Sequence, residues 1–229
     1  MKTRSDTDGK SLWLTNPHSV LAVLQERPKD VLEVQIPREG SEAWKVVAHQ
    51  FRQAKAGSGR ALVRPKAPCS VDELFAKKSW QDGDCFLALD TIQDPQNLGS
   101  IFRLAGFFGV KGIVITQNRS APISSTVIDV ASGGVEYVPF AIIPNLQHGI
   151  KTAKDAGVWA LGTSEHAEGS IRDIKADRPW LIVLGNEERG VRRLTSEKCD
   201  LMVRIPAAGP VESLNVAMSA AVLLSSLSR

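Results

Sequence analysis

The chain has 229 residues, a formal net charge of +3 and three cysteines, and this length can bury a large hydrophobic core that needs no disulfide or metal to stabilise it. The single cysteines form no CxxC pair and lie near no histidine cluster, which argues against a zinc site and a disulfide framework and fits a reducing cytoplasm or organelle matrix. No segment approaches the roughly 20 apolar residues of a membrane span, so we expect a soluble chain with no membrane partner and no metal.

The first 80 residues alternate short helical and extended patterns. The stretch PHSVLAVLQE predicts a helix after Asn16, DVLEVQI predicts a strand, and SEAWKVVAHQFRQAK predicts a second helix that ends at Gly57. The next passage, GSGRALVRPKAPCS, is rich in glycine and proline and predicts turns. We therefore predict a small αβ domain over residues 1–80, ahead of a second domain over residues 81–229.

Residues 43–71 carry positive charges without one aspartate or glutamate. Such a stretch can follow a phosphate backbone, where each contact displaces a counterion. The candidate RNA-binding residues are Lys45, Arg52, Lys55, Arg60, Arg64 and Lys66. The alternative is a solvated helix face followed by a basic linker, and composition leaves both interpretations open.

From Cys85 onward, short apolar runs alternate with helical segments. The predicted strands are CFLALD, GIVIT, YVPFAII, VWALGT, WLIVLG and LMVRIP. Strands that are apolar on both sides and alternate with helices indicate a parallel sheet covered on both faces, which is an α/β fold. Ligands of such sheets gather at the carboxyl ends of the strands, so the loops that follow the strands are the candidate sites.

The first such loop is DTIQDPQNLG, residues 90–99. Asn97 stands where a helix cap would, and the free N–H groups of a helix start attract anions. Arg103 lies among apolar neighbours in the same helix, so we expect its guanidinium to meet a negative partner such as a phosphate rather than to be wholly exposed. The alternatives are that Asn97 only caps the helix and that Arg103 pairs with Asp90 or Asp94 or extends to solvent.

Two later loops are ambiguous when each is taken alone. In LGNEERGV, residues 184–191, two glycines permit turns and Glu187 places a carboxylate at the sheet edge, but a solvated acidic turn also fits. This loop matches neither GxGxxG nor the GxxxxGK[ST] phosphate loop, so no dinucleotide or nucleotide triphosphate site is supported. In RIPAAGPVESLNVAMSAAVLL, residues 204–224, Ser213 can cap the last helix, and the small residues of that helix favour tight packing as much as a ligand-bearing loop.

Together and in this order, DPQNLGSIFRLAGFFGV, LIVLGNEERGV and IPAAGPVESLNVAMSAAVLL closely resemble the three motifs of the TrmH-like family of SPOUT RNA 2′-O-ribose methyltransferases. The resemblance covers residues 83–229. Residues 16–36 resemble, more weakly, the small RNA-binding domain of ribosomal-protein type that many rRNA-modifying members carry. The resemblance implies a parallel sheet with a C-terminal trefoil knot, S-adenosylmethionine as cofactor, and a homodimer in which both subunits complete a site.

The resemblance also implies individual site residues. The implied catalytic residues are Arg103, Asn97, Glu187, Ser213 and Asn215. The implied cofactor-binding residues are Thr163, Leu184, Gly185, Ile205, Leu214 and Asn215. Arg103 is expected to contact RNA as well. Pro210 and Ala217 stand where the family pattern has serine, so we expect the hydrogen bonding of that loop to differ from the family's.

The implied activity is methyl transfer from S-adenosylmethionine to a ribose 2′-hydroxyl in structured RNA. The N-terminal domain favours rRNA over tRNA as the substrate. Two alternatives are a tRNA 2′-O-methyltransferase and a catalytically inactive RNA-binding assembly factor. The intact motif residues argue against the inactive factor.

Overall fold

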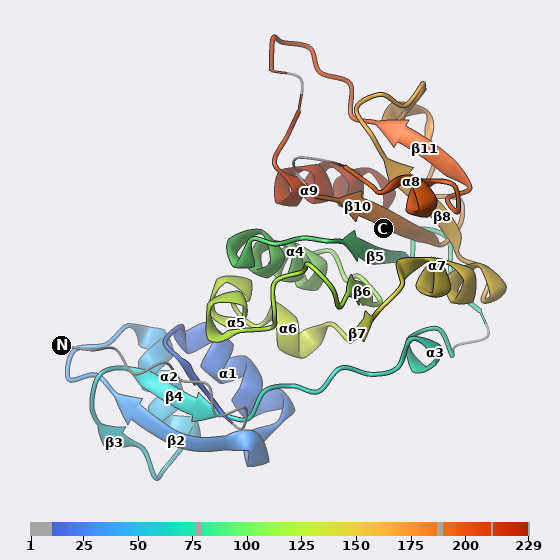
Figure 1. Cartoon of the computed structure of the whole chain (residues 1–229). Coiled ribbons are helices and arrows are strands. Elements are labelled where there is room, and N and C mark those ends of the chain that lie inside the picture. Colours follow the sequence, from blue (N-terminus) through green and yellow to red (C-terminus); the bar gives the residue numbers. More distant parts are fainter. Residues whose placement is uncertain (1–10, 77–78, 187–189, 212, 229) are drawn as a thin grey trace.

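The computed structural model describes residues 11–76, 79–186, 190–211 and 213–228. Two sheets organise this part of the chain (Figure 1). The strands are β1 (Leu12–Leu14), β2 (Val31–Ile36), β3 (Lys55–Ala56), β4 (Arg60–Val63), β5 (Cys85–Asp90), β6 (Ile113–Thr116), β7 (Phe140–Ile143), β8 (Trp159–Thr163), β9 (Gly169–Ser170), β10 (Trp180–Gly185) and β11 (Leu201–Arg204). The α-helices are α1 (Pro17–Glu26), α2 (Glu42–Gln50), α3 (Val71–Leu74), α4 (Pro95–Phe107), α5 (Ser125–Ala131), α6 (Gly134–Tyr137), α7 (Leu146–Asp155), α8 (Arg193–Ser196) and α9 (Val216–Leu227), with short 3-10 turns η1 (Pro28–Asp30) and η2 (Ile171–Asp173).

The larger sheet contains seven strands in the order β7-β6-β5-β10-β8-β11-β9, and each pairing is parallel. This confirms the α/β fold and all six predicted strands. The short strand β9 was not predicted, because two residues carry no periodicity. Because the strands are parallel, the loops after β5, β6, β8, β10 and β11 meet at one edge of the sheet.

Each face of this sheet has its own core. Leu87, Ile182 and Leu184 point into the cluster that contains α4, α5 and α9, whereas the alternate residues Phe86 and Val183 point into the cluster with α3 and α7. Side chains of a strand alternate between its two faces, and here both faces are covered. The near-continuous apolar runs of β5 and β10 follow from this double burial.

The N-terminal unit, residues 11–64, is a four-stranded sheet in the order β1-β4-β2-β3 packed on α1 and α2. The first helix begins where it was predicted, since the Asn16 side chain accepts a hydrogen bond from the N–H of His18. The second helix ends at Gln50, so the prediction that it extends to Gly57 is wrong. The predicted turn passage is also wrong in part, because residues 60–63 form β4 between β1 and β2.

This unit is joined to the larger sheet's helices by hydrogen bonds through Asp129 of α5. The Asp129 carboxylate accepts from the N–H and hydroxyl of Thr15 at 2.8 and 2.7 Å and from the N–H of Asn16 at 3.1 Å. The Asn16 side chain donates in return to the Asp129 carbonyl and to the Ser132 hydroxyl. Asn16 therefore both caps α1 and fixes α1 against α5 (Figure 1).

A second joint surrounds Glu136 of α6, whose side chain is 1 % exposed. Both Glu136 oxygens accept from the Arg27 guanidinium, at 2.8 and 3.0 Å. The Lys66 ammonium donates to the carbonyls of Val135, Glu136 and Val138 at the end of α6, and burial lowers its pKa. The segment that follows β4 and leads to the larger sheet is thus held against α6.

The change from one sheet to the other comes early along the chain. The smaller sheet ends at Val63, and the N–H of Cys69 already donates to the carbonyl of Phe140 in β7. The predicted domain boundary near residue 80 remains a prediction, but α3, at 71–74, packs on β7 of the larger sheet. No helix in the described part of the chain is long and apolar enough to cross a membrane.

Candidate functional site

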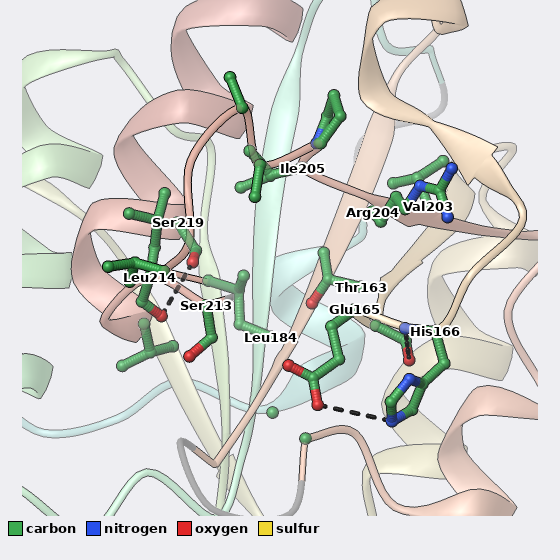
Figure 2. Close-up of a pocket in the computed structure, with 18 of the residues that line it drawn as sticks. Thr163, Glu165, His166, Leu184, Val203, Arg204, Ile205, Ser213, Leu214 and Ser219 are labelled. Atoms are coloured by element: carbon green, nitrogen blue, oxygen red, sulfur yellow. Dashed lines mark hydrogen bonds and ion pairs between the residues drawn. The ribbon is translucent and has the colours of Figure 1, made fainter.

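A cavity of about 580 Å³ lies at the carboxyl edge of the larger sheet, where β8, β10 and β11 end. It is lined by six of the predicted site residues: Thr163, Leu184, Gly185, Ile205, Ser213 and Leu214. Figure 2 shows how these side chains come from three separate segments, with Thr163 and Leu184 below Ile205 and with Ser213 beside Leu214. The cavity is therefore built by strand order, since residues 163, 184 and 205 are distant in sequence.

The floor of the cavity depends on Gly185. A Cβ on this residue would lie 2.0 Å from the Gly190 carbonyl carbon and 2.1 Å from the Val191 nitrogen, so only glycine fits. The loop closes on itself, because the N–H of Gly190 donates to the carbonyl of Asn186 at 2.7 Å. Glu187, a predicted catalytic residue, lies outside the residues that the structure describes.

Asp90 anchors this loop from below. Its carboxylate is fully buried, accepts from the backbone N–H of Arg192 at 3.1 Å, and lies 2.7 Å from the Arg192 guanidinium. The Asn186 side chain donates to the carbonyl of Thr91 at 3.2 Å. The loop after β10 is thus tied to the end of β5 on both sides of its turn.

The residues that cap α4 and α9 at this edge of the sheet are not the predicted ones. Asp94, not Asn97, caps α4, since the Asp94 side chain accepts from the N–H of Gln96, and Asn97 lies inside the first turn. Asn215, not Ser213, caps α9 by accepting from the N–H of Ala217 at 2.8 Å. The Asn215 amide also donates to the Asn97 side-chain oxygen at 2.8 Å, so two of the predicted catalytic residues are in direct contact.

Arg103 is exposed on α4, which fits the alternative that its side chain extends to solvent. The neighbouring Ile101 and Phe102 are fully buried, which places Arg103 on the outer face of the helix. Within the described residues it makes no ion pair and does not line the cavity. The guanidinium is therefore available to a partner outside this chain.

Several cavity residues were not predicted from the sequence. Glu165 and His166 follow β8 at the mouth of the cavity and contact each other at 3.5 Å (Figure 2). Asn186 and the segment 206–211 complete the wall. The rule that ligands gather after parallel strands pointed to all of these loops, but it does not select individual residues.

The six predicted RNA-binding residues of the basic stretch, residues 43–71, fall into two groups. Lys45, Arg52, Lys55 and Arg64 are exposed. Arg60 is half-buried, with its guanidinium 4.1 Å above the Trp13 ring and its Nε donating to Gln35. The three carbonyl contacts of Lys66 use the donors of its ammonium, so Lys66 serves the joint between the sheets.

The family model described as the SpoU rRNA Methylase family matches residues 84–225. This chain belongs to that family. The resemblance to TrmH-like methyltransferases is confirmed, and the match covers β5 to α9, the elements that build the cavity. Among the described residues, no three His, Cys, Asp or Glu side chains gather as a metal site.

Curated relatives agree with the family. The chain is 44 % identical over 138 residues to the 23S rRNA (guanosine-2′-O-)-methyltransferase RlmB of Nitrosomonas europaea, a match that covers 60 % of this chain and 53 % of that protein. It is 36 % identical to the TrmH family protein YacO of Bacillus subtilis over 96 % of this chain and 88 % of the relative. The matched part thus spans about half of the first relative and most of the second.

Solved structures share the whole fold. The SpoU methyltransferase AviRb of Streptomyces viridochromogenes, in complex with AdoMet, superposes with a TM-score of 0.76 at 20 % identity and covers 98 % of this chain and 92 % of its own. An AdoMet-bound rRNA methyltransferase of Sinorhizobium meliloti gives a TM-score of 0.73 at 23 % identity, covering 95 % of this chain and 86 % of its own. The N-terminal unit lies within both superpositions.

Proposed function

We propose that this protein transfers a methyl group from S-adenosylmethionine to a ribose 2′-hydroxyl of structured RNA, with rRNA favoured over tRNA. The observation that carries the proposal is the cavity at the carboxyl edge, which gathers Thr163, Leu184, Gly185, Ile205 and Leu214 in a chain of the SpoU family. The name of the Nitrosomonas relative, a 23S rRNA methyltransferase, supports the choice of rRNA.

The cavity fits S-adenosylmethionine in size and chemistry. Its volume of about 580 Å³ falls within the roughly 300–1,000 Å³ of pockets that hold compact organic ligands. Leu184, Ile205 and Leu214 offer apolar walls for an adenine ring, and Gly185 brings backbone to the same cavity. When bound, the cofactor supplies an electrophilic methyl carbon on a sulfonium.

The chain must align a weakly acidic hydroxyl with that carbon. The 2′-oxygen forms the new C–O bond, the C–S bond breaks with its electron pair left on sulfur, and the hydroxyl proton is released. Alignment of the reacting atoms accounts for a large part of the reduction in activation free energy in such displacements. Arg103 binds the RNA phosphate and orients the 2′-hydroxyl, and its planar fork suits this task while its guanidinium stays protonated.

The remaining predicted catalytic residues support this alignment. Asn97 and Asn215 hold the starts of α4 and α9 together through their hydrogen bond. Ser213 lines the cavity two residues before the cap of α9 and contributes a hydroxyl toward the substrate. Glu187 is assigned to the same site by its motif position.

The active form is a homodimer. Phe107 on α4 is 82 % exposed, and Met218 and Val222 on the neighbouring α9 are 62 % and 37 % exposed. Exposed large apolar side chains grouped on adjacent helices mark an interaction surface. A second copy that covers them would receive Arg103 from the same face of α4, so the two subunits would complete each site together.

The proposal includes three further features of the family. The chain that leaves β11 and re-enters the fold as α9, beside β10 and α4, forms the trefoil knot. The N-terminal unit binds RNA through its exposed cations, Lys45, Arg52, Lys55 and Arg64, with Arg60 at the edge of the same surface. The protein works in the cytoplasm, where rRNA is available.

The decisive experiment is methyl transfer from labelled S-adenosylmethionine to unmodified rRNA and tRNA transcripts, followed by mapping of the 2′-O-methyl position. Incorporation at one ribose of rRNA is expected. Incorporation only into tRNA would overturn the substrate choice. An RNA-binding chain with no heat-stabilisation by S-adenosylmethionine would instead be an assembly factor.

A further inference from the structure

The loop after β6 is fixed beside the loop that precedes α4. The N–H of Ala121 donates to the carbonyl of Ile92 at 2.8 Å. The Thr116 hydroxyl accepts from the N–H of Thr91 at 2.9 Å and contacts the Ser120 hydroxyl at 2.8 Å. Residues 117–121 are therefore held in place at the carboxyl edge of the sheet, next to the predicted catalytic segment.

Arg119, at the exposed tip of this loop, has a left-handed backbone with φ of +58°. Thr91 and Ser132 share such a conformation, and both make hydrogen bonds that join separate parts of the fold. Within the described residues, no hydrogen bond or ion pair is made by the Arg119 side chain. Glycine or asparagine would adopt this backbone with less strain, so the fold itself does not require arginine here.

Several exposed cations around the larger sheet pair with a carboxylate, as Lys111 does with Asp84, Lys154 with Asp200 and Arg193 with Glu197. At the carboxyl edge, the described ion pairs include Arg192 with buried Asp90 but none of the exposed Arg103, Arg119 and Arg204. Arginines without an acidic partner beside a cavity attract anions.

We propose that Arg119 binds a backbone phosphate of the substrate RNA next to the methylated nucleotide. This inference rests on the proposed function. In the sheet, β6 and β10 are separated only by β5, two strand spacings or about 10 Å, so one RNA strand can contact Arg119 while its target ribose faces the cavity after β10. The planar fork of arginine suits a phosphate, and the strained backbone is retained because the side chain has this role.

The test uses Arg119→Gly, which removes the side chain and relieves the left-handed backbone, and Arg119→Lys, which keeps the charge. RNA affinity is measured over a salt series with unmodified rRNA and tRNA transcripts, together with melting temperature and the Kd of S-adenosylmethionine. For Arg119→Gly we expect RNA affinity to fall roughly tenfold and the slope of log K against log salt to shrink by about 0.7–0.9, the value of one phosphate contact. The melting temperature should stay or rise, the cofactor Kd should not change, and Arg119→Lys should keep the slope.

A matched control is Lys151→Gln, which also removes one exposed positive charge but lies on α7 in an ion pair with Asp155. Its salt slope should equal that of the wild type. If Arg119→Gly lowers the melting temperature and leaves RNA affinity and slope unchanged, Arg119 is structural and the inference is wrong. Absence of methyl transfer by the wild type would overturn the proposed function, while the salt slope would still decide whether Arg119 contacts RNA.

Discussion

The Asn215 side-chain amide donates a 2.8 Å hydrogen bond to the Asn97 side-chain oxygen, and the Asn215 oxygen accepts from the N–H of Ala217. One side chain thus caps α9 and holds the first turn of α4. The start of the last helix and the segment that carries Arg103 are therefore fixed relative to each other.

Asn215→Asp separates the capping of α9 from the hydrogen bond to Asn97. Aspartate still caps a helix, so the melting temperature should change little, but it cannot donate to Asn97. We expect methyl transfer to fall at least tenfold. Asn215→Ala loses the cap as well and should cost about 1 kcal/mol of unfolding free energy. Wild-type turnover in Asn215→Asp would show that the contact with Asn97 is dispensable.

Arg103→Lys keeps a positive charge but loses the planar fork. Turnover should fall by two orders of magnitude or about 3 kcal/mol of transition-state stabilisation, with the Kd of S-adenosylmethionine unchanged. The checks are steady-state kinetics and calorimetric titration of the cofactor. Unchanged turnover would remove Arg103 from the mechanism.

Asp90→Asn tests the anchor of the loop after β10. The substitution keeps the shape but removes the charge that faces Arg192. Since Asp90 is buried and Arg192 is half-exposed, we expect a loss of about 1–3 kcal/mol in stability and weaker cofactor binding. Urea unfolding and cofactor titration measure the two effects, and a fully retained cofactor Kd would mean that the loop holds its shape without this contact.

Glu136→Gln tests the joint between the two sheets. The partly buried Arg27 guanidinium loses the charge of Glu136 but keeps Asp30, so the unfolding free energy should fall by about 1–3 kcal/mol. The control is Asp155→Asn, whose pair with Lys151 is exposed and should change stability by less than about 0.5 kcal/mol. Equal effects of the two substitutions on urea unfolding would contradict the assignment.

Stability should fall in alkaline solution because of two thiols, one buried and one partly buried. Burial raises the pKa of Cys85 and that of Cys199, each to about 12. Between pH 9 and 12 the unfolded thiols lose protons that the folded thiols keep, so each contributes a decline of up to about 1.4 kcal/mol per pH unit. The double variant Cys85→Ala, Cys199→Ala should show a shallower decline than the wild type in unfolding experiments over this range, and identical slopes would count against the shifts.

The strands of the larger sheet could be predicted because β5 and β10 are apolar on both faces, which few other structures permit. The cap of α4 could not be placed, since Asp94 and Asn97 both follow a strand and only backbone angles decide which one caps. The sequence left the exposure of Arg103 open, because its apolar neighbours lie on the opposite face of the same helix. The cavity wall after β8 depends on the pairing of β11 with β8, a contact between distant segments.

The hydrogen bonds of Thr15, Asn16 and Arg27 hold the N-terminal sheet against α5 and α6. Lys66 holds the segment between the two sheets against α6, because its ammonium donates to the carbonyl of Glu136. These contacts set the distance between the exposed cations Lys45, Arg52, Lys55 and Arg64 and the cavity. In the proposed reaction, the substrate RNA is therefore selected by whether it can reach the basic surface and the cavity at the same time.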